Sequence, residues 1–98
     1  MQVTIPHQFT KEQALKRVQE ALDRARAQIA EQATITEERW EGDTLHFGFS
    51  GQGQSISGTF TVKDTEFELY AKLPLMMKLF EKKIEAAIKE QASKMLGK

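Results

Sequence analysis

The side chains best suited to acid–base chemistry in this chain are its histidines and its single tyrosine. His46 and Tyr70 fall on polar positions of two alternating segments, near a region that contains Ser57 and Thr59. A histidine–tyrosine–serine group can move a proton or bind an anion, so His46 and Tyr70 are candidates for a site on the polar face. A solvated sheet surface explains the same residues without chemistry, and we favour that interpretation. His7 lies far from His46 in the sequence, on a different element.

Phosphate and metal chemistry have weaker support. Gly51-Gln52-Gly53 lacks the third glycine and the Lys-Ser/Thr pair of phosphate-binding loops, so a hairpin turn is the favoured interpretation. Glu37, Glu38, Glu41 and Asp43 are interpreted as acids of an edge strand and its turn rather than as a catalytic pair. The sequence has no cysteine and no His/Asp/Glu cluster with ligand spacing. We therefore expect no metal, no cofactor and no catalytic residue.

The segment after Pro74 carries the densest group of large apolar side chains. We expect most of these side chains to pack in the core, although Met77 is predicted to lie off the buried stripe. Methionine adapts to varied apolar surfaces, so side chains left exposed would contact a second copy of the chain or another apolar surface. The candidate interaction surface consists of Leu75, Met76, Met77, Phe80 and Lys83.

Apolar residues at helical spacing predict two amphipathic helices. The first runs from about residue 11 to 31. It begins at a capping box, in which the Thr10 hydroxyl accepts an early backbone N–H and Gln13 reaches back. The second begins after Pro74, which suits a first helical turn, and Gly97 is its expected C-terminal cap. Its buried stripe is predicted to contain Met76, Leu79, Phe80, Ile84, Ala87, Ile88 and Met95.

Alternating apolar and polar residues predict five strands. The second strand has two mixed faces, which suit an edge position. Gly42-Asp43, Gln52-Gly53 and Asp64-Thr65 are the predicted turns between the last four strands. The strands span residues 3–5, 35–40, 45–50, 56–62 and 67–73.

These turns set the registers of the strands. All the resulting pairs place apolar residues on one face, whereas a slip of one residue would turn a strand's apolar set outward. Gly58 then lies between Phe47 and Ala71, where a neighbouring ring can cover its backbone, so we assign it a packing role. The predicted pairs are Phe49–Ile56, Phe47–Gly58, Leu45–Phe60, Val62–Phe67, Phe60–Leu69 and Gly58–Ala71.

The element order β-α-β-β-β-β-α predicts a single α+β domain over residues 1–98. We expect a two-layer sandwich, in which two helices cover one face of an antiparallel meander sheet. Fourteen basic residues balance fourteen acidic ones, which argues against nucleic-acid binding. No apolar run approaches the roughly 18 residues of a membrane span, and the first residues lack a signal core, so we expect a cytoplasmic protein.

The charges are unevenly distributed. Lysines predominate after residue 77, and acids predominate between residues 37 and 68. A basic helix beside an acidic sheet edge could guide self-association or recognition of a partner. Two ordinary solvated surfaces are the alternative, and we favour it.

Several short motifs occur one after another along the chain. They are Ile5-Pro6-His7, Trp40-Glu41-Gly42-Asp43, Ser50-Gly51-Gln52-Gly53, Ser57-Gly58, Leu73-Pro74 and the closing Leu96-Gly97-Lys98. In these motifs the chain resembles the small bacterial polyhydroxyalkanoic acid system proteins. The resemblance implies a link to polyhydroxyalkanoate granules, the storage polyester bodies of bacteria. It implies no catalytic residues.

The layout also resembles a shortened helix-grip domain, in which a curved antiparallel sheet wraps a C-terminal helix. That resemblance implies the strand order 1-5-4-3-2. Helix-grip proteins often hold apolar ligands between sheet and helix. This chain is much shorter, so we expect its own Phe and Leu side chains to fill the core.

Three functions are compatible with these observations. The first, which we favour, is a non-enzymatic accessory protein of the polyhydroxyalkanoate system that binds a granule surface, a granule-associated protein or a second copy of itself. The second is a small carrier of fatty or hydroxy acids, which requires a cavity of a few hundred Å³ between sheet and helix. The third is an enzyme that uses His46 and Tyr70, and no thioesterase, hydratase or synthase motif supports it.

Overall fold

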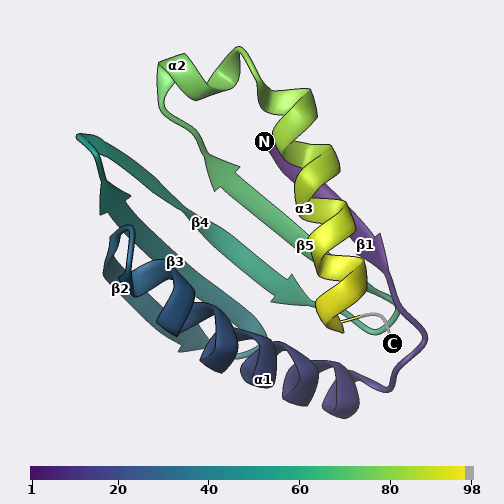
Figure 1. Cartoon of the computed structure of the whole chain (residues 1–98). Coiled ribbons are helices and arrows are strands. Elements are labelled where there is room, and N and C mark those ends of the chain that lie inside the picture. The colour runs from purple at the N-terminus through teal and green to yellow at the C-terminus, as the bar shows by residue number, and fades with distance from the viewer. Residues whose placement is uncertain (97–98) are drawn as a thin grey trace.

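The computed structural model describes residues 1–96, which form a five-stranded sheet with two long helices on one face (Figure 1). The predicted α+β fold is confirmed, with one additional short helix. Gly97, the predicted C-terminal cap, lies outside the described residues. The elements are β1 (Gln2–Pro6), α1 (Lys11–Ala30), β2 (Thr34–Glu41), β3 (Thr44–Gly51), β4 (Gln54–Val62), β5 (Glu66–Lys72), α2 (Leu75–Lys78) and α3 (Glu81–Leu96).

The sheet is antiparallel throughout and has the expected order β1-β5-β4-β3-β2. All six predicted pairs between β3, β4 and β5 are confirmed. The predicted turn after β3 is also confirmed, because Gln52 and Gly53 both have positive φ, 53° and 78°. Two successive left-handed residues form the type I′ turn, which matches the natural twist of paired strands.

Gly58 lies where β5 approaches β4 most closely. A Cβ atom at this position would lie 2.0 Å from the backbone oxygen of Tyr70 and 2.8 Å from the Cα of Ala71. The predicted packing role of Gly58 therefore has a different physical origin. The backbone of the neighbouring strand, rather than an aromatic ring, excludes a side chain.

The predicted capping box starts α1. The Thr10 Oγ1 accepts a hydrogen bond from the Gln13 N–H at 3.1 Å, and the Gln13 Oε1 accepts one from the Thr10 N–H at 3.1 Å. Along the helix, Ala14, Val18 and Ala21 are buried against the sheet. The enclosed core below them is formed mainly by β1, β4 and β5, and its other members are Val3, Ile5, Val62, Phe67 and Leu69.

The prediction of one continuous helix after Pro74 is wrong. The chain forms α2, then a tight turn in which the Phe80 N–H donates to the Met77 oxygen at 3.0 Å, and only then α3. Figure 1 shows α2 beyond the end of β5, where there is no sheet beneath it. Because the turn interrupts the helical phase, a stripe that starts in α2 does not continue on the buried side of α3.

Candidate apolar binding site

An open apolar groove lies between the two long helices. Its volume is about 450 Å³, and Gln91 is the one polar residue among those that line it. We call it the α1/α3 groove. Its floor consists of Leu45, Phe47 and Phe60 from β3 and β4, and its walls consist of Val18, Ala21, Leu22 and Ala25 from α1 with Ile84, Ala87, Ile88, Gln91 and Ala92 from α3.

The path of the chain explains why the groove exists. β1 and β2 are opposite edges of the sheet, so α1, which connects them, must cross the sheet obliquely. α3 follows β5 and packs beside β1, so the two helices diverge above β3 and β4 (Figure 1). Alanines line both walls and do not fill the space between them. The expectation that Phe and Leu side chains fill the core is therefore wrong at this position, where Phe47 and Phe60 remain half-buried.

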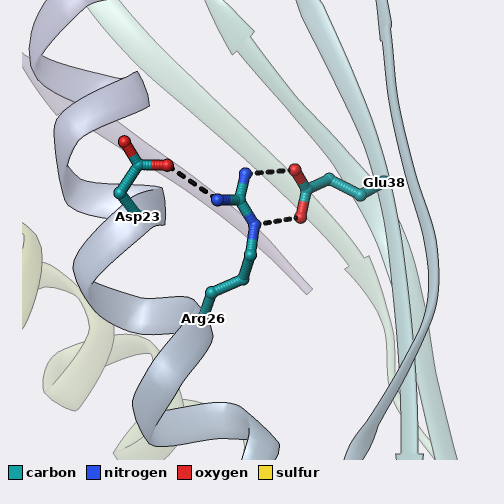
Figure 2. Close-up of polar contacts among 3 residues, drawn as sticks. All are labelled: Asp23, Arg26 and Glu38. Carbon is teal, nitrogen blue, oxygen red and sulfur yellow. Dashed lines mark hydrogen bonds and ion pairs between the residues drawn. The ribbon is translucent and has the colours of Figure 1, made fainter.

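A smaller cavity of about 130 Å³ shares four lining residues with the groove, and Arg26 and Glu38, two members of a charged cluster, also line it. Figure 2 shows Arg26 of α1 between Asp23, one turn earlier, and Glu38 of β2. The Arg26 Nε donates to Glu38 Oε1 at 2.9 Å, and Nη1 donates to Asp23 Oδ1 at 2.7 Å. Nη2 donates to the second oxygen of Glu38, which makes the Arg26–Glu38 pair bidentate.

The cluster connects two elements rather than offering a free charge. The hydrogen bonds from Arg26 lower the pKa of the Glu38 carboxyl. The hydrogen bonds that Arg26 makes to Glu38 and Asp23 raise the pKa of its own guanidinium. Both effects hold the residues in their charged forms. Since each carboxylate has Arg26 as its partner, the cluster connects α1 to the edge strand β2.

The second apolar surface is the projecting turn around α2. Leu75, Met76, Leu79 and Phe80 are 80%, 70%, 83% and 57% exposed, and we call these four residues the α2 patch. Large apolar side chains concentrated on one projection are a feature of interaction sites rather than of ordinary monomer surfaces. The interpretation of most of these residues as core is therefore wrong.

The sequence candidates and the exposed surface overlap only partly. Leu75, Met76, Phe80 and Lys83 are exposed, whereas Met77, the residue expected to lie off the buried stripe, is half-buried. Leu79, which the sequence pattern places on the buried stripe, is the most exposed residue of the α2 patch. The signal for it was present in the sequence, because five of the six residues 75–80 are apolar and one helix face cannot bury them all.

The polar-face candidates lie in one row of the sheet. Thr59 of β4 pairs with His46 on one side and with Tyr70 on the other, so the imidazole and the phenol are two strands apart, about 10 Å by strand spacing. The His46 Nε2 lies 3.0 Å from Glu41 Oε1. Tyr70 is 55% exposed. The row therefore brings the two residues onto one face without direct contact.

His7 has a structural role. Its ring is buried against Phe67, with 4.6 Å between ring centroids. The Nδ1 accepts the Phe9 N–H at 3.1 Å, which leaves Nε2 to donate to the Lys63 oxygen at 2.8 Å. His7 thus joins the β1–α1 connection to the β4–β5 turn.

None of the helices within residues 1–96 is long and apolar enough to cross a membrane. Within the same part of the chain, no three His, Cys, Asp or Glu side chains are grouped so that they could hold a metal ion.

Comparison with known proteins identifies one family. No curated protein and no solved structure shows a significant match. The model of one family, described as "putative polyhydroxyalkanoic acid system protein", matches residues 1–96 and so covers nearly the whole chain. The motifs noted in the sequence and this match agree, and the chain belongs to the polyhydroxyalkanoic acid system protein family.

Proposed function

We propose that the protein is a non-enzymatic, cytoplasmic accessory protein of the bacterial polyhydroxyalkanoate storage system, and that it acts by binding the granule surface through the α2 patch. The observation that carries this proposal is the exposure of Leu75, Met76, Leu79 and Phe80 on one projecting turn. The family match supports the connection with the polyester. A granule-associated protein is the alternative target of the same patch.

The chemistry of the patch suits a polyester. Burial of each large apolar side chain against a hydrocarbon-rich surface contributes about 1.5–3 kcal/mol. Lys78, Lys82 and Lys83 are exposed beside the patch. Their ammonium groups can donate hydrogen bonds to ester carbonyl oxygens or pair with carboxylate chain ends, while their methylene stems cover apolar surface.

Co-sedimentation with isolated granules tests this proposal. The Leu79→Glu variant places a charge in the centre of the patch and should lose at least about 90% of the binding, since one removed apolar contact of this size corresponds to a factor of about ten or more. Ala86→Glu is the matched control, because Ala86 is exposed on α3 outside the patch and the groove. Both variants should keep the circular dichroism spectrum of the wild type. Undiminished co-sedimentation of a folded Leu79→Glu variant would overturn the proposal.

A second candidate function is favoured by the α1/α3 groove. Its volume of about 450 Å³ meets the requirement stated for a fatty or hydroxy acid carrier and falls in the range of about 300–1,000 Å³ typical of small-molecule sites. The almost wholly apolar lining suits an alkyl chain, with Gln91 available to a polar head group. Saturable binding of a fluorescent fatty acid at one molecule per chain is the measurement that tests it.

A further inference from the structure

The chain exposes more surface than a folded monomer of its mass usually does. Its accessible surface is 6794 Å² and its mass is 11.2 kDa. The size scaling for folded monomers gives about 5,700 Å² for this mass, so the excess is about 1,100 Å². Each partner in a stable protein complex buries about 800 Å². The excess is thus sufficient for one side of an interface.

The two apolar surfaces are adjacent on the molecule. The α2 patch ends at Phe80, and the lining of the α1/α3 groove on α3 begins at Ile84. The Ile84 N–H donates to the Phe80 oxygen at 2.9 Å, so the two residues are one helical turn apart. Because the projection and the groove are close together, both can take part in one two-fold interface. In such an isologous interface, the projection of each copy meets the groove of the other copy.

We propose that two copies of this chain form a reciprocal dimer, in which the α2 patch of each copy fills the α1/α3 groove of the other. The arrangement places large side chains against small ones, since the patch presents four large side chains and the groove walls carry Ala21, Ala25, Ala87 and Ala92. Both surfaces are apolar, so their contact would remove both from water at once.

The helical segment after β5 and the edge strand β2 carry opposite net charges. Residues 75–94 contain five lysines and three glutamates, whereas residues 34–43, on and beside β2, contain four acids and one arginine. The smaller cavity, which shares Leu22 and Phe47 with the groove, is also lined by Glu37 of β2, so a lysine-bearing segment seated in the groove would come near this acidic edge. Such complementarity favours correctly oriented encounter between the copies.

Formation of this dimer does not depend on granule binding, because it uses only surfaces of the chain itself. If both proposals hold, pairing covers the α2 patch until a granule surface competes for it. The dimer is measured with purified protein in the absence of granules, so its failure and the failure of granule binding are separate results.

Sedimentation equilibrium of the full chain, from micromolar to near-millimolar concentrations, tests the proposal. The wild type should reach twice the chain mass. Leu79→Glu in the patch and Ala87→Glu in the groove should each weaken dimerisation about a hundredfold or more, because each change acts at two symmetry-related contacts. Ala86→Glu should leave dimerisation unchanged. Met76→Glu repeats the test at a second exposed position of the patch.

A mixture of two variants distinguishes the reciprocal arrangement from other dimers. Leu79→Glu keeps an intact groove and Ala87→Glu keeps an intact patch, so the mixed pair retains one of the two contacts. Mixing them should therefore give clearly more dimer than either variant forms alone, at the same total concentration. A wild type that stays monomeric at every concentration would overturn the proposal. A dimer that neither variant weakens, or a mixture without recovery, would do the same.

Discussion

At position 58 in β4, a residue other than glycine would fit only if the neighbouring strand moved. The clash of a side chain there would be with the backbone of Tyr70 and Ala71, which cannot rotate away as a side chain can. Gly48, in β3, provides a contrast. A Cβ at Gly48 would meet the Oγ1 of Thr36 at 2.8 Å, which is the movable end of a side chain. Two glycines in the same sheet thus differ in what surrounds them.

Gly58→Ala should reduce the free energy of unfolding by about 1–3 kcal/mol or more, the usual range for overpacking of a tight site. Gly48→Ala is the matched control and should have a clearly smaller effect, since Thr36 can move. Urea denaturation followed by circular dichroism measures both values. Equal effects of the two variants would contradict the assignment of a backbone clash to Gly58.

At the scale of elements, a charged pair connects α1 to β2. Arg26 reaches from the helix to Glu38 on the edge strand, and its bond lowers the pKa of that carboxyl (Figure 2). A carboxyl group whose pKa is lower in the folded state stabilises the fold above its ordinary pKa, here 4.5. That contribution is lost as the pH falls through the lower folded pKa.

The wild type should therefore lose stability on acidification below pH 4.5 more steeply than Glu38→Gln does. At neutral pH the substitution should lower the free energy of unfolding by no more than about 1 kcal/mol, because the pair is partly exposed and screened by solvent. Denaturation curves at several pH values measure the difference. Glu12→Gln, in the first turn of the same helix, serves as a control for removal of a carboxylate. Parallel pH profiles for the wild type and Glu38→Gln would show that the pair contributes nothing.

The helices also show which element boundaries local signals can specify. The start of α1 was predicted correctly because Thr10 and Gln13 satisfy backbone groups within one turn. The break between α2 and α3 carries neither proline nor glycine, so no local signal marks it. It follows instead from where the sheet ends, because α2 lies beyond the end of β5 and has no apolar sheet surface to cover (Figure 1).

At the scale of the whole molecule, the α1/α3 groove is assembled from four elements that are distant in sequence. Its floor belongs to β3 and β4 and its walls to α1 and α3. All the lining residues except Gln91 are apolar, yet the space between them depends on the angle between the helices. A site of this kind has no sequence motif, because no single segment contains it.

Filling the groove tests its ability to hold a ligand. Ala87 is exposed and lines the groove, so Ala87→Phe should fold normally, place a ring in the groove and weaken fatty-acid binding at least tenfold. The neighbouring Ala86→Phe adds the same ring outside the groove and should leave binding unchanged. Competition with a fluorescent fatty acid measures both variants. Equal affinity of the two variants for the fatty acid would exclude the groove as its site.

The sequence by itself determined the five strands, the registers between β3, β4 and β5, the turn after β3 and the α+β fold. Each of these depends on alternation or capping among residues that are close in the chain, or that a tight turn brings together. It also carried the family resemblance, through motifs such as Trp40-Glu41-Gly42-Asp43. Only the tertiary structure decided that Met76, Leu79 and Phe80 are exposed and that Phe47 and Phe60 line an open groove. The physical reason is that an amphipathic pattern shows which face avoids water, whereas the direction of each helix over the sheet decides how much of that face is covered.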